Sequence, residues 1–236
     1  MKVTILNPEE ATKLFEYWGK ASCVCYDTTT NSPEKVGKGC MNSGHYSGSR
    51  GRYILFKVEE CPRFCIDQAV RHENGIMKNV QSFRYVSKDS FIYEVPSEIE
   101  DSDMLLGKYH VHMINTMGLY TEIQDYVFNK TKSHERANEQ ARYVLPISTN
   151  ADFVIGMTVE ALIHFMNVRL CVRAEDKIRE LALLIKKKTL EILPELTEVL
   201  VPNCQALLWC PEGHASCGAY PTKNQLKDII AEVKKG

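Results

Sequence analysis

The chain has 236 residues, of which 44% are hydrophobic and 25% charged, and its net charge is −1. This composition is ordinary for a globular protein and excludes a disordered or fibrous chain. The near-zero charge argues against a general nucleic-acid binder, although a local basic pocket is compatible with it. The longest apolar runs, such as 181–185, are far shorter than the about 18 residues that span a bilayer, so no membrane partner is expected.

The N-terminal residues and the cysteine content indicate the cellular compartment in which we expect the protein. Residues 1–10 lack a basic region followed by an apolar stretch, so we expect no signal peptide and a cytoplasmic location. The nine cysteines are an odd number, which favours reduced thiols over a disulfide framework. Cys204, Cys210, His214 and Cys217 lie close together near the C-terminus but contain no paired Cys-x-x-Cys. We therefore predict no bound metal, and a zinc-stabilised interaction module stays an open alternative.

The first half of the chain shows helix starts and one strand-forming run. Asn, Pro and two acids at 7–10 favour a helix start, and Ser-Pro-Glu at 32–34 favours a second, short helix. Residues 53–58 are rich in strand formers and predict a strand. Residues 61–72 predict a helix with one apolar face. The glycine and two asparagines within 74–81 predict a loop.

The second half is mainly helical, as its apolar spacing indicates. A long helix is expected over 101–129, with Gly118 as the point where it would be interrupted. The other expected elements are a helix at 133–143, a strand at 151–155, and helices at 158–170, 174–193 and 222–234. Because no stretch has the composition of a linker, we predict a single, mainly helical α+β domain over 1–236.

Three arginines are placed in a way that favours an anion site. Gln68 and Arg71 are three residues apart, so they share one face of the predicted helix. Arg142 ends a Glu-Gln-Ala-Arg run, and Arg169 lies on an otherwise apolar helix face, where an unpaired charge is costly to bury. An internal ion pair is the simpler interpretation for any one of them. Three together, with a loop at 78–85 that carries a serine, favour phosphate binding, because guanidinium groups bind phosphate bidentately.

Several motifs, in the correct order over about 44–185, resemble the flavin-dependent thymidylate synthases. Arg71-His72-Glu73 followed by Ser82-Phe83-Arg84-Tyr85 is similar to the family pattern of Arg-His-Arg, a spacer, Ser, then x-Arg-Tyr. The other similar segments are Gly-His at 44–45, Gln68 three residues before the Arg-His pair, Ala-Arg-x-x-Leu-Pro at 141–146, and the run from Phe to Arg at 165–169.

The resemblance implies both a fold and an activity. The fold would be α+β, with a central antiparallel sheet and long helices, assembled as a homotetramer whose active sites draw on several subunits. The activity would be the formation of dTMP from dUMP, with methylenetetrahydrofolate as the one-carbon donor, NADPH as the reductant and FAD as the flavin. No enzyme cysteine would attack the base.

The same resemblance implies roles for individual residues. Arg169 would orient and polarise the pyrimidine, and Arg169 and Ser82 are the catalytic candidates. The substrate-binding residues would be Gln68, Arg71, Ser82, Phe83, Arg84, Arg142 and Arg169, with Ser82 and Arg84 on the phosphate. The cofactor-binding residues would be Arg71, His72, Glu73, Asn79, His164 and Arg173.

The sequence departs from the family pattern mainly on the flavin side. Glu73 stands where the third signature residue is usually arginine, and Thr158 and Glu160 stand where asparagine and arginine usually contact the flavin. Glu73 would either weaken flavin binding or pair with Arg50 or Arg52. Two alternatives stay open: a related enzyme that methylates C5 of UMP or dCMP, and a nucleotide-binding paralogue without flavin chemistry.

Overall fold

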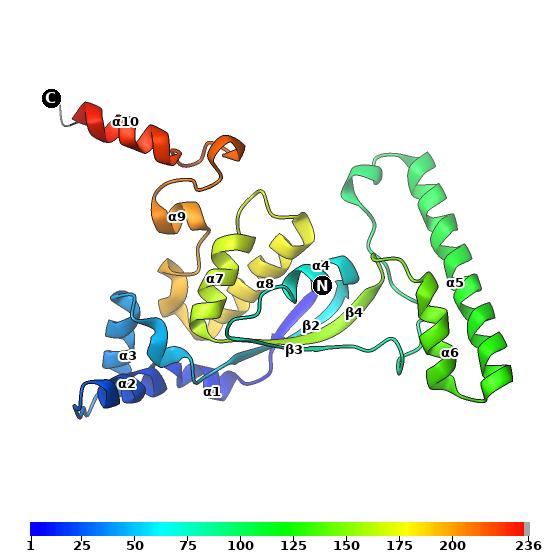
Figure 1. Cartoon of the computed structure of the whole chain (residues 1–236), viewed down its shortest axis with the longest axis horizontal. Coiled ribbons are helices and arrows are strands. Elements are labelled where there is room, and N and C mark those ends of the chain that lie inside the picture. The colour runs from blue at the N-terminus through cyan, green and yellow to red at the C-terminus, as the bar shows by residue number, and fades with distance from the viewer. Residues whose placement is uncertain (234–236) are drawn as a thin grey trace. The chain divides into compact units, whose positions relative to one another are not determined.

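The computed structural model describes residues 1–233 and shows an α+β chain built on a four-stranded sheet (Figure 1). The strand order is β1-β2-β4-β3, and the strands are antiparallel, so the predicted fold class is confirmed. The strands are β1 (Lys2–Ile5), β2 (Ile54–Pro62), β3 (Ile76–Val80) and β4 (Asn150–Met157).

The chain divides into two compact units. The first unit comprises Met1 and residues 58–68 and 79–153. The second unit comprises residues 2–57, residues 69–78 and the chain from Val154 on. Strands β2, β3 and β4 each begin in one unit and end in the other.

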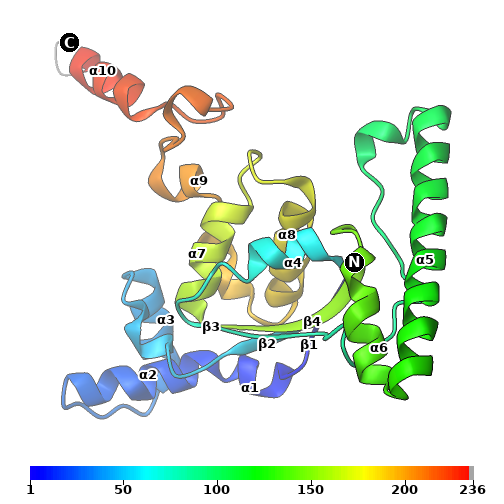
Figure 2. The same ribbon diagram turned by 45° about the vertical axis from the view of Figure 1, so that its right-hand side comes forward.

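The second unit contains most of the helices. In this unit α7 and α8 lie on one side of the strands, and α1 and α2 lie on the other (Figures 1 and 2). Its helices are α1 (Pro8–Thr12), α2 (Leu14–Cys25), α3 (Pro33–Asn42), α7 (Val159–Arg169), α8 (Asp176–Ile192), α9 (Asn203–Leu207) and α10 (Lys223–Val233). Its largest fully buried side chains include Trp18, Phe56, Phe165 and Met157, so the core forms where these helices meet the sheet.

The first unit contains a long helical hairpin, α5 (Asp103–Thr131) and α6 (His134–Ala141), together with all but the last residue of the short helix α4 (Arg63–Ala69). The hydroxyl of Ser133 accepts the Arg136 N–H at 3.2 Å and caps α6. Lys132, in the left-handed region at φ 55°, ends α5 and turns the chain into α6. A 3-10 turn at Arg142–Val144 follows α6.

Most of the predicted helices agree with the structure. The long helix is continuous through Gly118, and the helix predicted at 222–234 corresponds to α10, except that residue 234 lies outside the described residues. The helices predicted at 133–143, 158–170 and 174–193 correspond to α6, α7 and α8, and the strand predicted at 151–155 corresponds to β4.

The loop predicted at 74–81 is wrong, because residues 76–80 form β3. Pairing with β4 outweighs the local loop signal: Gln81 N–H donates to the carbonyl of Asp152 at 2.9 Å, and Thr158 N–H donates to that of Gly75 at 3.0 Å. Gly75, at φ +68°, lies just before the strand. Strand β1 is not among the predicted elements.

The helix predicted at 61–72 is shorter, because β2 continues to Pro62 and passes directly into α4. Just before this transition Glu60 adopts a left-handed backbone conformation, with φ 56°. Its N–H donates to Oδ1 of Asp152 at 3.0 Å. This bond supports a conformation that a non-glycine residue adopts only at an energetic cost.

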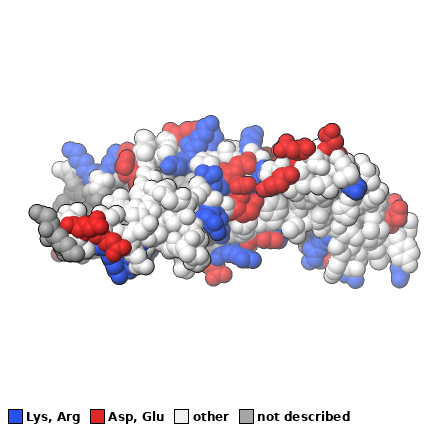
Figure 3. All heavy atoms as spheres, turned by 90° about the horizontal axis from the view of Figure 1, so that it is seen from above, with Lys and Arg blue, Asp and Glu red and all other residues white. Residues whose placement is uncertain are grey.

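No helix within residues 1–233 is long and apolar enough to cross a membrane. On the face shown in Figure 3, lysine and arginine side chains are interspersed with aspartate and glutamate, and large areas carry neither. The prediction that the protein does not bind nucleic acid stays a prediction.

The contact between α2 and α3 depends on glycine. A Cβ on Gly37 would lie 2.1 Å from the carbonyl oxygen of Phe15, and one on Gly19 would lie 1.7 Å from that of Pro33. We expect Gly37→Ala to destabilise the protein by about 1–3 kcal/mol, because the helices would have to separate. Gly39→Ala, in the same helix but with no atom within 4 Å, should stabilise it by up to about 1 kcal/mol. Chemical denaturation of both variants tests this, and equal effects would contradict it.

Candidate active site

One cavity of the second unit, of about 400 Å³, contains five of the predicted site residues. It lies between the segment that precedes β3 and one side of α7. Its lining comprises Arg71, His72, Glu73, Asn74, Ile76, Ala161, His164, Val168 and Arg169. Arg71 and Arg169, which the sequence singles out separately, are therefore neighbours in the fold.

The side chains of Arg169 and His72 are joined by a hydrogen bond within this cavity. The Arg169 Nε–H donates to Nε2 of His72 at 3.0 Å, across 97 positions of sequence. Burial is the largest cause that lowers the pKa of His72 to about 4, and the nearby positive charges of Arg169 and Lys78 act in the same direction. At neutral pH the imidazole is therefore uncharged and accepts the Arg169 proton donor. Its ring also packs edge-on against Phe165, with the ring centres 5.0 Å apart.

Arg71 and Glu73 are exposed at the same cavity. Within residues 1–233, neither side chain has a hydrogen-bond or ion-pair partner. An unpaired guanidinium beside an imidazole and the Asn74 amide suits an anionic group such as the flavin cofactor that the sequence resemblance implies. The Glu73 carboxylate opposes such a group, so the fit depends mainly on Arg71 and its neighbours.

Arg50 and Glu160 form a bidentate pair in the second unit. Arg50 Nε lies 2.5 Å from Oε2 of Glu160, and the second nitrogen lies 3.0 Å from Oε1. The hydrogen bond to Arg50 lowers the pKa of Glu160. Arg52 instead lies over the Tyr17 ring, 4.9 Å from its centre. The expected pairing of Glu73 with Arg50 or Arg52 is therefore absent from residues 1–233.

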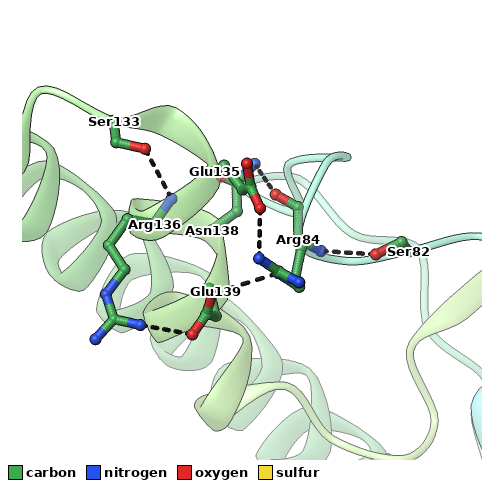
Figure 4. Close-up of polar contacts among 7 residues, drawn as sticks. All are labelled: Ser82, Arg84, Ser133, Glu135, Arg136, Asn138 and Glu139. Carbon is green, nitrogen blue, oxygen red and sulfur yellow. Dashed lines mark hydrogen bonds and ion pairs between the residues drawn. The ribbon is translucent and has the colours of Figure 1, made fainter.

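In the first unit, Arg84 is held by carboxylates (Figure 4). Its guanidinium hydrogen-bonds to Glu135 and lies 3.3 Å from a carboxylate oxygen of Glu139. The backbone of the same loop is tied down as well, since Arg84 N–H donates to Ser82 Oγ at 3.3 Å and the Asn138 amide donates to the Arg84 carbonyl at 3.2 Å. Glu139 also pairs with Arg136 at 2.6 Å, so two guanidinium groups and two carboxylates form one cluster at this position.

A second cavity, of about 380 Å³, lies entirely in the first unit. It contains the predicted residues Phe83 and Arg142 and also Arg63, which the sequence reasoning missed. Its remaining lining residues are Tyr143, Leu145, Pro146 and Ile147. The sequence gives only a weak indication that Arg63 belongs to a site. It is a cation near the predicted start of a helix, and it lies four residues before Asp67.

The remaining predicted site residues lie outside these two cavities. Gln68 is half-buried on α4, and Asn79 is exposed on β3. Arg173 lines a third cavity, of about 230 Å³, in the second unit. The structure therefore brings five predicted residues, Arg169 included, into the first cavity and two, Arg142 included, into the second.

The third cavity also contains four cysteines: Cys171, Cys204, Cys210 and Cys217. Burial raises the pKa of the Cys204 thiol, and the three other thiols contribute in the same direction. Within residues 1–233, no group of three or more His, Cys, Asp or Glu side chains is arranged to hold a metal ion. The geometry therefore gives no support to the zinc-stabilised module.

Comparison with known proteins gives the family. Residues 10–195 match the family described as thymidylate synthase complementing protein. The chain is 32% identical over 187 residues to the flavin-dependent thymidylate synthase of Nitratidesulfovibrio vulgaris, covering 79% of this chain and 76% of that relative. The chain belongs to the flavin-dependent thymidylate synthase family. The family member from Clostridium tetani is 31% identical over 198 residues, which is 79% of each chain.

A solved flavin-dependent thymidylate synthase shares the fold. The chain superposes on the Helicobacter pylori enzyme ThyX, crystallised with FAD and dUMP, with a TM-score of 0.61 and 17% identity. The match covers 85% of this chain and all of that one. The sequence-based assignment to the flavin-dependent thymidylate synthases is therefore confirmed by sequence and by fold.

Proposed function

We propose that the protein is an FAD-dependent thymidylate synthase that methylates dUMP to dTMP. Methylenetetrahydrofolate is the one-carbon donor and NADPH is the reductant. Membership of the family supports this function. The observation that carries it in the structure is the bond between Arg169 and His72, which brings the Arg-His signature and the distant arginine to one cavity.

Arg169 is the residue proposed to act on the base. Methylation at C5 builds negative charge on the pyrimidine ring, and a guanidinium fixed beforehand beside the ring oxygens stabilises that charge. The neutral His72 ring holds the Arg169 guanidinium by accepting its Nε–H. Arg169 therefore does not have to be oriented again in each catalytic cycle.

The other site roles are proposed from the family. Bound FAD would supply the hydride that completes the methyl group. The residues proposed to hold it are Arg71, His72, Glu73, Asn79, His164 and Arg173. The residues proposed to bind the nucleotide are Gln68, Arg71, Ser82, Phe83, Arg84, Arg142 and Arg169, with Ser82 as the second catalytic candidate.

We propose a homotetramer, and α5 supplies one argument for it. Met104, Val111 and Ile114 are large apolar residues with exposed fractions of 65%, 58% and 62%. With Gly107 and Gly118 they follow a heptad spacing, and a Cβ on either glycine would meet no atom within 4 Å. Such a seam is suited to close packing against a helix of a second copy of the chain.

We also propose that residues 1–236 act as a single catalytic domain in the cytoplasm. Three of the four strands run through both compact units, which supports one catalytic domain. All nine cysteines are free thiols, as is usual in a reducing compartment.

The test is direct product detection. The purified chain is incubated with dUMP, methylenetetrahydrofolate, NADPH and FAD, and dTMP is measured by liquid chromatography and mass spectrometry. Parallel reactions with UMP and dCMP test the alternative substrates. Flavin absorbance near 450 nm in the purified protein tests cofactor binding. Formation of dTMP is expected, whereas a colourless protein that makes no methylated nucleotide with added FAD would exclude both enzyme functions.

A further inference from the structure

The third cavity of the second unit brings four cysteines to one place. Its lining includes Cys171 from the segment after α7, Cys204 from α9, and Cys210 and Cys217 from the chain that follows α9. The last three of these lie beyond residues 10–195, the part of the chain that matches the family. The thiol cluster is therefore separate from the residues of the family signature.

The backbone after α9 is fixed by main-chain contacts. Leu208, in the left-handed region at φ 61°, ends α9 two residues before Cys210. The Cys210 N–H donates to the carbonyl of Pro221 at 2.7 Å, and Cys210 also forms an isolated β-bridge with Thr222. A non-glycine residue keeps a left-handed conformation only where the surrounding structure fixes it. The backbone therefore holds Cys210 in place.

Cys171 and Cys204 are the two thiols best placed to meet. Helix α7 packs against α9 (Figures 1 and 2), and Cys171 follows the end of α7 while Cys204 belongs to α9. Both are half-buried, whereas Cys210 is buried and Cys217 is exposed. Burial raises the pKa of the Cys204 thiol, and among the neighbouring thiols Cys171 raises it most, as expected for the nearest one.

Four cysteines in one cavity are also the ligand set of a structural zinc site. Within residues 1–233, however, no three His, Cys, Asp or Glu side chains are arranged to hold a metal ion. The four thiols are free. Oxidation to a disulfide needs only two of them to meet, so it is the chemistry that this arrangement favours.

We propose that Cys171 and Cys204 form a reversible disulfide under oxidising conditions. The bond would tie α9 to the end of α7, two residues after Arg169. The oxidant is a low-molecular-weight disulfide such as oxidised glutathione, and in a reducing compartment the resting form is the dithiol. This inference does not depend on the proposed function.

The exchange proceeds in two steps. The Cys171 thiolate attacks one sulfur of the small disulfide, which breaks that S–S bond, releases one small thiol and leaves a mixed disulfide on Cys171. The Cys204 thiol then loses its proton and attacks the Cys171 sulfur, which releases the second small thiol. The protein gives up two electrons and two protons, and the two released thiols carry them. Because the raised pKa of Cys204 keeps it protonated at neutral pH, the first attack falls to Cys171.

The experiment maps the bond in the full-length protein. The native protein is equilibrated with mixtures of reduced and oxidised glutathione and quenched with acid. The remaining thiols are then blocked with N-ethylmaleimide in denaturant, and the peptides are identified by mass spectrometry. We expect the peptide of Cys171 joined to that of Cys204, two hydrogen masses below the sum of the two thiol peptides. Excess reduced glutathione should restore both thiols.

The digestion has to separate the three C-terminal cysteines. Trypsin leaves all three in one peptide, 189–223. Chymotrypsin cleaves after Trp209 and Glu-C protease cleaves after Glu212. The combined digestion therefore gives separate peptides for Cys204, Cys210 and Cys217.

Thermal stability gives a second readout. A bond between positions 33 residues apart restricts the unfolded chain, so the oxidised protein should melt about 5 °C or more above the reduced protein. Cys171→Ser and Cys204→Ser should each abolish both the bond and this shift. Cys25→Ser removes an exposed thiol of α2 and should keep both. If a serine variant fails to fold, the peptide map of the wild type decides the question.

Three results would overturn the inference. In the first, Cys171 and Cys204 stay separate after oxidation, as thiols or as mixed disulfides with glutathione. In the second, Cys204 is joined to Cys210 or Cys217 instead. In the third, the purified protein contains stoichiometric zinc that only a chelator removes, which would make the thiols metal ligands. None of these results bears on dTMP synthesis, which the product assay tests separately.

Discussion

Replacing Arg169 by alanine is expected to lower kcat about 100- to 1000-fold, which is the usual cost of losing one fixed donor to charge that develops in a transition state. The melting temperature should change little, since Arg169 is only partly buried and lies at the end of α7. Stopped-flow or steady-state assays of dTMP formation measure the effect. Arg169→Lys tests the geometry, because it keeps the charge but lacks the Nε–H that bonds to His72.

A control and a contradicting result complete this test. Lys187→Ala removes a cation from α8 and should leave kcat unchanged. Arg169→Ala activity within tenfold of the wild type would exclude a role for Arg169 at the base. A parallel loss of activity in the control would point instead to a general electrostatic effect.

The second large effect is expected at His72, which positions Arg169. His72→Leu removes the acceptor for the Arg169 Nε–H and should lower kcat at least about tenfold, since a partly buried donor is left without its partner. His72→Gln places an amide oxygen near the position of Nε2 and should recover part of the activity. Equal activity of the two variants would contradict a positioning role.

The pH dependence of stability gives a readout independent of activity. The folded-state pKa of His72 is about 4, whereas an unfolded histidine titrates near about 6.5. Between these values the unfolded chain binds a proton that the folded protein does not, so the free energy of unfolding should fall as the pH drops from 6.5 towards 4. His72→Gln should show a shallower slope over that range in denaturant titrations. An identical slope would show that the imidazole is not buried in its neutral form.

The sequence predicts most of the helices, because their apolar residues recur at helical spacing over ten or more positions. It also predicts that Arg71 and Arg169 belong to one site, but only through the resemblance, since no local pattern relates residues 98 positions apart. The 74–81 segment shows the limit of local reasoning. Its glycine and asparagines predict a loop, yet pairing with β4 makes it a strand.

The ion-pair partners of the arginines at these sites could not be predicted from the sequence either. The pair between Arg50 and Glu160 joins residues 110 positions apart, and Glu135 reaches Arg84 across 51 positions. Both pairs depend on how the helices are placed. The same is true of Arg63, whose proximity to Arg142 follows from main-chain bonds to Thr149 and Ile147.

Asp152 stabilises the left-handed backbone at Glu60, and through it the start of α4 beside the cavity that contains Arg142. The Asp152 carboxylate bonds to the Glu60 N–H three residues before Arg63 begins α4. Loss of that carboxylate would let the strand relax and would shift the first turn of the helix. The cavity that Arg63 shares with Phe83 and Arg142 would then change shape through a side chain that is not part of its lining.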